Sequence, residues 1–340
     1  MEPENNTIIN YIDNNFSPTK EDITNIAKHY EKVWNILWPS TLFQSWSYPR
    51  NTSIRPINDL DIIKVLSYGK SKEDAEKILL DIHQQLLSAY AKIEIWYNHL
   101  KLQKSSIWIY FAEDEDKFSI DIVPAIETNK VDVIYWTTIY NVPEIQKINK
   151  FRRNKLYSDL NYKWDNWIYS APKAYKEHSI RLDDLSQDKF RYFVRFIKQW
   201  KRNCKKEYDW FCLKSFHIEQ ICWILVNEDR SLSLYWLLFK FFDKIEKRFQ
   251  EGKKIQDLAY EGGFEDRYID EYVEDPEKNT PEFREYLRKE VIRVKSLLGQ
   301  FSVGMSQSDI DQILDKVLKK APVDKPTVVS NIPNWPWLWK

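Results

Sequence analysis

Three aspartates stand in segments that are otherwise apolar and typical of strands. Asp59 and Asp61 open the run "DLDIIKVLSYG", and Asp121 lies in the middle of "FSIDIVPAIE". Two residues apart on a strand, the side chains of Asp59 and Asp61 point to the same face, about 7 Å apart along the backbone. An unpaired carboxylate inside a sheet is costly, and a bound cation offsets that cost. The three acids are therefore candidate metal ligands.

A set of carboxylates without thiolate or imidazole partners favours a hard cation, Mg²⁺ or Mn²⁺. Two such ions can hold the attacking and leaving oxygens of an in-line phosphoryl displacement. A structural alternative exists, because Asn58-Asp59-x-Asp61 is also typical of a turn that enters an edge strand. The acid in the second strand favours the metal interpretation, since two separate segments then share one unusual feature.

The order of these segments resembles the polymerase-β-like nucleotidyltransferases, and within them the cGAS/DncV-like group of bacterial second-messenger synthases. That group has Gly-Ser-Tyr-x-Arg-x-Thr-x-Ile-x-Pro, then Asp-x-Asp on a strand, then a third Asp in a strand similar to "vDvvPA". This chain has "SYPRNTSIRP" at 47–56, then Asp59-Leu60-Asp61, then "IDIVPA" at 120–125. One position departs from the pattern: Trp46 replaces the glycine, and we expect its indole to turn away into the palm.

The second half of the chain extends the resemblance, which spans roughly residues 20–300. "FIKQWKR" is similar to the family's lysine-bearing helix, and "LKSFHIEQICW" to its Ser-aromatic-His segment. By that correspondence Lys198 and Ser215 contact the donor triphosphate, and Ser47 holds its phosphates from the palm. Asp59 and Asp61 bind both Mg²⁺ ions, and Asp121 binds the ion that activates the acceptor ribose hydroxyl.

The resemblance implies an α+β fold, a polymerase-β-like palm sheet with an N-terminal helix packed against a C-terminal helical lobe. We expect the palm lobe at 1–165, the helical lobe at 166–320 and an extended tail at 321–340. The implied activity joins NTPs, ATP among them, into a cyclic di- or trinucleotide with release of pyrophosphate. The implied context is anti-phage (CBASS-type) signalling, with a downstream effector that reads the product. The alternatives are a linear oligonucleotide or small-molecule nucleotidylyltransferase, or a catalytically degenerate nucleotide-binding module.

Apolar periodicity predicts the elements that position these residues. A helix at 18–37 begins with Thr19-x-x-Asp22, a capping box, and a second helix follows at 71–92. Strand-like runs lie at 40–48, 59–69, 93–97, 105–114, 117–127 and 131–136. Helical periodicity then dominates at 188–202, 215–227, 232–252, 280–299 and 306–320, with Gly252 and Gly299 as expected C-caps.

Composition limits the classes of function. The chain has 340 residues, with 51 Lys plus Arg balanced by 51 Asp plus Glu, which argues against bulk electrostatic binding of nucleic acid. The 6 glycines leave no dinucleotide-binding fingerprint and no Walker loop. We expect no membrane partner, since no run approaches 18 consecutive apolar residues. A polar N-terminus and an odd number of cysteines suggest a cytoplasmic protein.

Three further features of the sequence each allow two interpretations. Cys204, Cys212, His217 and Cys222 have spacings unlike a zinc knuckle, so buried helix cysteines are favoured over a zinc site. The basic runs 147–155 and 198–206 are solvated faces or line a groove for a nucleotide or activating ligand. The Trp-rich end "NWPWLWK" packs back onto the protein or docks on an operon-encoded partner.

Overall fold

The computed structural model describes most of the chain. The described residues are 5–45, 47–57, 59–66, 75–89, 100–103, 105–111, 118–132, 134–143, 167–209, 211, 213–250, 280–302 and 304–319. Several predictions lie outside the described residues: the orientation of Trp46, the strand at 93–97, the basic run 147–155, the cap at Gly252 and the tail. Cys212 is also outside them.

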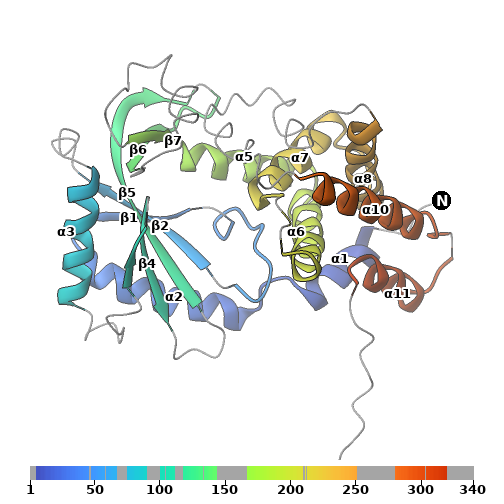
Figure 1. Ribbon diagram of the computed structural model, residues 1–340, viewed down its shortest axis with the longest axis horizontal. Coiled ribbons are helices and arrows are strands. Elements are labelled where there is room, and N and C mark those ends of the chain that lie inside the picture. Colours follow the sequence, from blue (N-terminus) through green and yellow to red (C-terminus); the bar gives the residue numbers. More distant parts are fainter. Residues whose placement is uncertain are drawn as a thin grey trace, which may run out of the picture.

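A mixed, twisted sheet forms one side of the molecule (Figure 1). Its central order is β1 (Thr41–Ser45), β2 (Asp59–Leu66), β5 (Phe118–Val131), β4 (Ile107–Phe111) and β3 (Leu100–Leu102). The long β5 also pairs with β6 (Thr138–Pro143), which pairs with β7 (Trp167–Ser170). The pair β2–β5 is parallel, and the other pairs are antiparallel.

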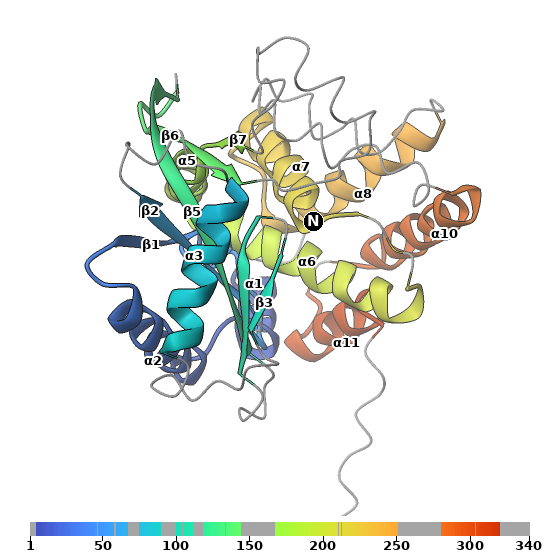
Figure 2. The ribbon, with the colours of Figure 1, turned by 60° about the vertical axis from the view of Figure 1, so that its left-hand side comes forward.

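Two helices, α2 (Lys20–Leu37) and α3 (Ala75–Ser88), cover one face of this sheet (Figure 2). The predicted capping box of α2 is confirmed, because Thr19 Oγ1 accepts from the Asp22 backbone N–H and Asp22 accepts from the Thr19 backbone N–H. Ile23 and Leu80 belong to the apolar residues of these two helices, yet they are 45% and 48% exposed. Leu80 follows the buried Leu79 directly, and neighbours on a helix cannot share a face.

The other side of the molecule is helical. It contains α1 (Asn5–Asn15), α5 (Pro172–Leu185), α6 (Lys189–Glu207), α7 (Ser215–Glu228), α8 (Leu234–Gln250), α10 (Pro281–Leu298) and α11 (Gln307–Val317). All of these helices contribute to one apolar core that surrounds Trp200. Cys204 and Cys222 are buried in this core, as the sequence favoured. Gly299 caps α10 as predicted, donating its backbone N–H to Lys295 O at 2.9 Å.

The prediction of an α+β fold is confirmed, but one predicted strand is wrong. Residues 131–136 do not form a separate strand: Val131 ends β5, and the chain then turns toward β6. The Asp132 carboxylate accepts from the backbone N–H groups of Ile134 and Tyr135. A side-chain acceptor of this kind stabilises a turn in spite of the β-branched composition. Trp136, at the end of this turn, is 77% exposed.

Two elements pack across the expected boundary at residue 165, and the division into lobes stays a prediction. The helix α1 packs in the helical core through Ile8, Tyr11 and Ile12, although it precedes the palm in sequence. Strand β7, after the boundary, pairs with β6 of the sheet. Within the part of the chain that the structure describes, no helix has both the length and the apolar surface needed to cross a bilayer.

Candidate active site

The register of the sheet brings the three predicted acids together. Asp61 on β2 lies directly opposite Asp121 on β5, and Asp59 lies opposite Ser119. Their neighbours Leu60 and Ile120 point to the other face, where they pack beneath α2 and α3. Side chains alternate along a strand, so the acids share the face that is turned away from these helices. The hydrophobic contacts of the palm thus fix where the carboxylates point.

Burial and the neighbouring carboxylates raise the pKa values of Asp61 and Asp121. Burial is the main reason why the pKa of Asp61 lies well above its usual range, and the charges of Asp59 and Asp121 raise it further. The charge of Arg50 lowers this pKa only in part. Burial also raises the pKa of Asp121, although Ser106 Oγ donates a hydrogen bond to Asp121 Oδ1 at 2.7 Å. A divalent cation near these groups would offset both burial and repulsion.

The donor set fits Mg²⁺ or Mn²⁺, because it consists of carboxylate oxygens. Among the described residues, no three His, Cys, Asp or Glu side chains already surround a single metal position. Asp61 and Asp121 lie opposite each other on adjacent strands, beside Asp59. The carboxylate oxygens would have to move closer together to bind a common ion.

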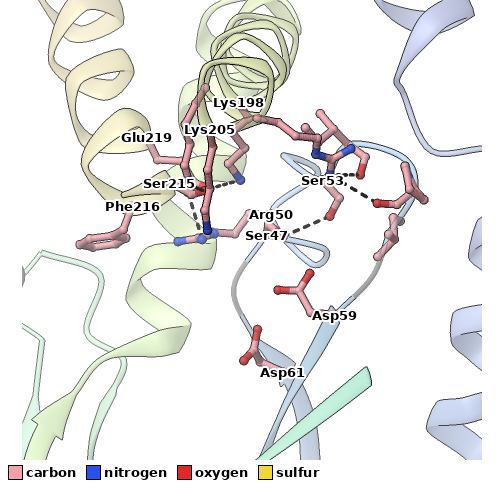
Figure 3. Close-up of a pocket in the computed structure, with 15 residues that line it drawn as sticks. Ser47, Arg50, Ser53, Asp59, Asp61, Lys198, Lys205, Ser215, Phe216 and Glu219 are labelled. Atoms are coloured by element: carbon pink, nitrogen blue, oxygen red, sulfur yellow. Dashed lines mark hydrogen bonds and ion pairs between the residues drawn. The ribbon is translucent and has the colours of Figure 1, made fainter. Parts of the chain in front are cut away.

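A cavity of about 370 Å³ separates the acids of β2 from the helical lobe. Its lining comes from the turn and loop before β2, from β2 itself, and from α6 and α7: Ser47, Arg50, Ser53, Ile54, Pro56, Ile57, Asp59, Asp61, Lys198, Lys201, Arg202, Lys205, Ser215, Phe216 and Glu219. Figure 3 shows the carboxylates of Asp59 and Asp61 on one side and the side chains of α6 and α7 on the other. The predicted Ser47, Lys198 and Ser215 all line this cavity; Asp121 lies one strand beyond Asp61.

One face of α6 forms a cationic wall of the cavity. Lys198, Lys201, Arg202 and Lys205 follow at i, i+3, i+4 and i+7, a spacing that places them on one side of a helix. Lys201 Nζ donates to Ser215 Oγ at 2.8 Å. Burial first, and then neighbouring cations, lower the pKa of Lys201 to about 8. Four residues of the basic run 198–206 therefore line a cavity, and its use by a nucleotide or an activating ligand stays a prediction.

The turn that carries Ser47 is closed by its own hydrogen bonds. The Thr52 backbone N–H donates to Ser47 O at 3.0 Å, and the Asn51 N–H donates to Tyr48 O at 3.0 Å. Ser53 Oγ donates to Ser47 Oγ at 3.3 Å. These contacts hold the Ser47 hydroxyl at the edge of the cavity.

A buried ionic cluster joins this turn to the helical lobe. Glu219 of α7 pairs with Arg50 at 3.0 Å and also with the Lys198 ammonium. Lys198 Nζ donates in addition to Thr52 O at 3.1 Å and to Thr52 Oγ1 at 3.2 Å. The lysine that we predicted to contact the triphosphate is therefore engaged by protein groups at the cavity wall.

Sequence reasoning did not single out Arg50, Lys201 or Glu219, although Arg50 belongs to the motif at 47–56 and Lys201 to the basic run 198–206. A signal for Glu219 was present, because it is a single carboxylate among "IEQICWILV", an otherwise apolar helical run. Lys201 could not be separated from its basic neighbours without knowing which face of α6 meets the cavity.

Solved structures share the fold over most of this chain. A CdnC:HORMA-deltaN complex from E. coli MS115-1 aligns with 94% of this chain and 98% of its own, at 17% identity and a TM-score of 0.64. A CdnE cyclic dinucleotide synthase from Elizabethkingia meningoseptica, with GTP and Apcpp, aligns with 87% and 99% at 14% identity and a TM-score of 0.56. The apo form of DncV from Vibrio cholerae aligns with 89% of this chain and 76% of its own, at 15% identity and a TM-score of 0.54.

The chain has the fold of the cGAS/DncV-like nucleotidyltransferases. The resemblance read from its motifs is thereby confirmed at the level of the fold. A scan of protein-family models gives no match, and neither does a search of curated protein sequences. On this cGAS/DncV-like fold, the acids and the cationic wall come from opposite sides of one cavity.

Proposed function

We propose that this protein is a metal-dependent nucleotidyltransferase that joins NTPs into a cyclic di- or trinucleotide and releases pyrophosphate. The observation that supports this most directly is the pairing of Asp61 with Asp121 in register, beside Asp59, across a cavity from four cations of α6. Nucleotidyl transfer needs anions to hold metal ions and cations to hold phosphates, and it depends mostly on positioning and charge neutralisation.

In this proposal Asp59 and Asp61 would hold two Mg²⁺ or Mn²⁺ ions, and Asp121 would hold one of them. When bound, the ions would supply charge neutralisation at the donor α-phosphate and would lower the pKa of the attacking ribose hydroxyl. Ser106 keeps the Asp121 carboxylate in place through its hydrogen bond at 2.7 Å.

The donor triphosphate lies against Ser47 from the palm and against Lys198 and Ser215 from the helical lobe. We add Lys201 to this set, because its ammonium already donates to the Ser215 hydroxyl at the cavity wall. Lys198 then acts mainly through its charge, since Glu219 and Thr52 engage its ammonium. Phe216, next to Ser215, offers an aromatic face at the cavity for a nucleobase.

The comparisons support NTPs as substrates, because one solved CdnC structure contains ATP and the CdnE structure contains GTP and Apcpp. We propose ATP among the substrates of this chain. In line with the sequence resemblance, the product would act in anti-phage signalling by binding a downstream effector. The HORMA partner of the solved CdnC complex makes an operon-encoded protein partner reasonable for this chain as well.

The test is to incubate the purified protein with labelled NTPs and Mg²⁺ or Mn²⁺, treat with phosphatase, and identify the products by mass spectrometry. The proposal expects a phosphatase-resistant product with the mass of a cyclic di- or trinucleotide. A product that loses terminal phosphates would indicate a linear oligonucleotide, and no product with any NTP would indicate a degenerate nucleotide-binding module.

A further inference from the structure

A single carboxylate ties the palm turn to both helices of the cavity wall. Glu219, Arg50, Lys198 and Thr52 are each no more than 6% exposed. Glu219 Oε2 lies 3.0 Å from an Arg50 guanidinium nitrogen, Thr52 Oγ1 donates to Glu219 Oε1 at 3.1 Å, and the Lys198 ammonium pairs with the same oxygen. Arg50 and Thr52 belong to the palm, Lys198 to α6 and Glu219 to α7.

The charge on Glu219 is maintained against its burial. Burial pushes the pKa of Glu219 upward, but Arg50, Lys198 and the Thr52 hydroxyl together hold that pKa below its ordinary value. The carboxylate is thus ionised and neutralises one of the two buried cations that contact it. Removing one partner from a buried ionic cluster leaves the others uncompensated, which is far more costly than losing an exposed pair.

The ionic cluster around Glu219 is connected to Ser47 through the backbone of the turn 47–53. Thr52, which contacts both Glu219 and Lys198, donates its backbone N–H to Ser47 O. A second hydrogen bond links α6 to the following loop: Arg202 Nη1 donates to Arg55 O at 2.7 Å. The loop leads directly into β2 and Asp59. The contacts of Glu219 therefore set the position of Ser47 relative to the helical lobe.

We propose that Glu219 is a positioning residue, which holds the turn 47–53 against α6 and α7 and so sets the geometry of the triphosphate site. It acts through Arg50, Lys198 and Thr52. The inference rests on the proposed function, because it assigns a role at the same site. Its loss weakens NTP binding and slows turnover together, while the metal-binding acids keep their places.

The chain offers a matched control in Glu290. This glutamate of α10 is 3% exposed, accepts from Trp200 Nε1 at 3.0 Å and pairs with Arg293 at 2.6 Å and Lys319 at 2.9 Å. It resembles Glu219 in its own burial and in having two cationic partners, although Arg293 and Lys319 are more exposed than Arg50 and Lys198. Its contacts among the described residues lie within the helical lobe. A variant at Glu290 therefore reports the cost of disturbing a buried ionic cluster that does not reach the cavity.

The experiment compares Glu219→Gln and Glu290→Gln by thermal unfolding and by equilibrium binding of a non-hydrolysable ATP analogue with Mg²⁺. Both variants are expected to unfold at lower temperature than the wild type. Only Glu219→Gln is expected to bind the analogue about tenfold more weakly or worse, as for the loss of a hydrogen bond to a charged group. Glu219→Asp is expected to restore part of that affinity.

A pair of less disruptive variants, both at Thr52, keeps the test decisive if Glu219→Gln does not fold. Thr52→Val removes the hydroxyl between Glu219 and Lys198 but leaves both ion pairs, and Thr52→Ser keeps the hydroxyl. We expect Thr52→Val to weaken analogue binding by several-fold and Thr52→Ser to bind as the wild type does. Folded Glu219→Gln or Thr52→Val protein with wild-type affinity overturns the inference alone, as does equal weakening by Glu290→Gln. A wild-type protein that binds no NTP overturns this inference together with the proposed function.

Discussion

At the scale of single residues, Asp61 lies in an environment that opposes its charge. Its raised pKa means that the folded state holds the proton more tightly than the unfolded state. The stability of the metal-free protein therefore falls as pH rises from the ordinary aspartate range through the raised value. At neutral pH and without metal, Asp61→Asn should unfold at a higher temperature than the wild type. In the presence of Mg²⁺, its turnover should be about 10²–10³-fold lower than that of the wild type.

Calorimetry in EDTA and a turnover assay in Mg²⁺ check both halves of this prediction. The matched variant Asp132→Asn changes an aspartate in the turn after β5, away from the cavity. It should retain turnover. An Asp61→Asn protein that is less stable than the wild type, or that turns over at the wild-type rate, would show that the acid serves packing instead of metal binding.

Lys201 gives the site a pH dependence of its own. Its pKa is lowered to about 8, chiefly by burial and then by neighbouring cations. The ammonium form binds phosphate and prevails below that pH, and its fraction falls about tenfold between pH 7 and pH 9. Affinity for an NTP analogue should therefore decline across this interval in the wild type. Lys201→Arg should remove most of the decline, because arginine stays protonated.

Titrations of analogue binding at pH 7, 8 and 9 measure this effect. Lys176→Arg, on α5 and outside the cavity lining, is the control and should follow the wild type. If Lys201→Arg also follows the wild-type curve, the ammonium of Lys201 does not contact the phosphates.

Most of the candidate site residues whose type conflicts with their surroundings could be predicted from the sequence, although Glu219 was overlooked. Asp59, Asp61 and Asp121 were identifiable because carboxylates are unusual in β-branched strands. Lys201 was not, since a lysine in a basic helical run conflicts with nothing until the helix face toward the cavity is known. The partners of Lys198 were equally hidden, because Thr52 and Glu219 are 146 and 21 residues away in the chain.

At the scale of elements, the N-terminal cap of α2 should contribute measurably to stability. Thr19 and Asp22 each satisfy a backbone N–H of the other at the first turn. Thr19→Ala should lower the free energy of unfolding by about 1 kcal/mol. Thr24→Ala is the control within the same helix, because Thr24 donates to the Lys20 carbonyl in an exposed, interior position. It should be neutral or slightly stabilising, and an equal loss for both variants in urea unfolding would contradict the capping role.

Strong periodic patterns predicted elements well, and short or polar segments did not. The helices α6 and α10 follow their apolar stripes closely, whereas α7 keeps its predicted bounds but is buried at every position from His217 to Val226. The helix α1 escaped prediction because "NNTIINYIDNN" is polar overall, and its three buried side chains find their partners in helices distant in sequence. The error at residues 131–136 has the opposite origin: a β-branched composition was overridden by the side-chain hydrogen bonds of Asp132.

At the scale of the whole molecule, a ligand in the cavity should stabilise both sides of the protein, since the lining comes from the palm and from α6 and α7. A ligand at a hundredfold excess over its Kd stabilises a folded protein by about 2.7 kcal/mol. A non-hydrolysable NTP analogue with Mg²⁺ should therefore raise the unfolding temperature, and EDTA should remove most of the increase. An increase that is unaffected by EDTA would separate nucleotide binding from the metal site.

The most direct test of the account is a measurement of pyrophosphate release. Metal-stripped protein is mixed with all four NTPs, and Mg²⁺ or Mn²⁺ is then titrated in, for the wild type and for Asp59→Asn, Asp61→Asn and Asp121→Asn. We predict no release from the wild type without metal, saturable release with it, and release at least about 10²-fold slower from any variant that remains folded. Release without metal, or release at the wild-type rate after the removal of these aspartates, would contradict the assignment of catalysis to the acids of β2 and β5.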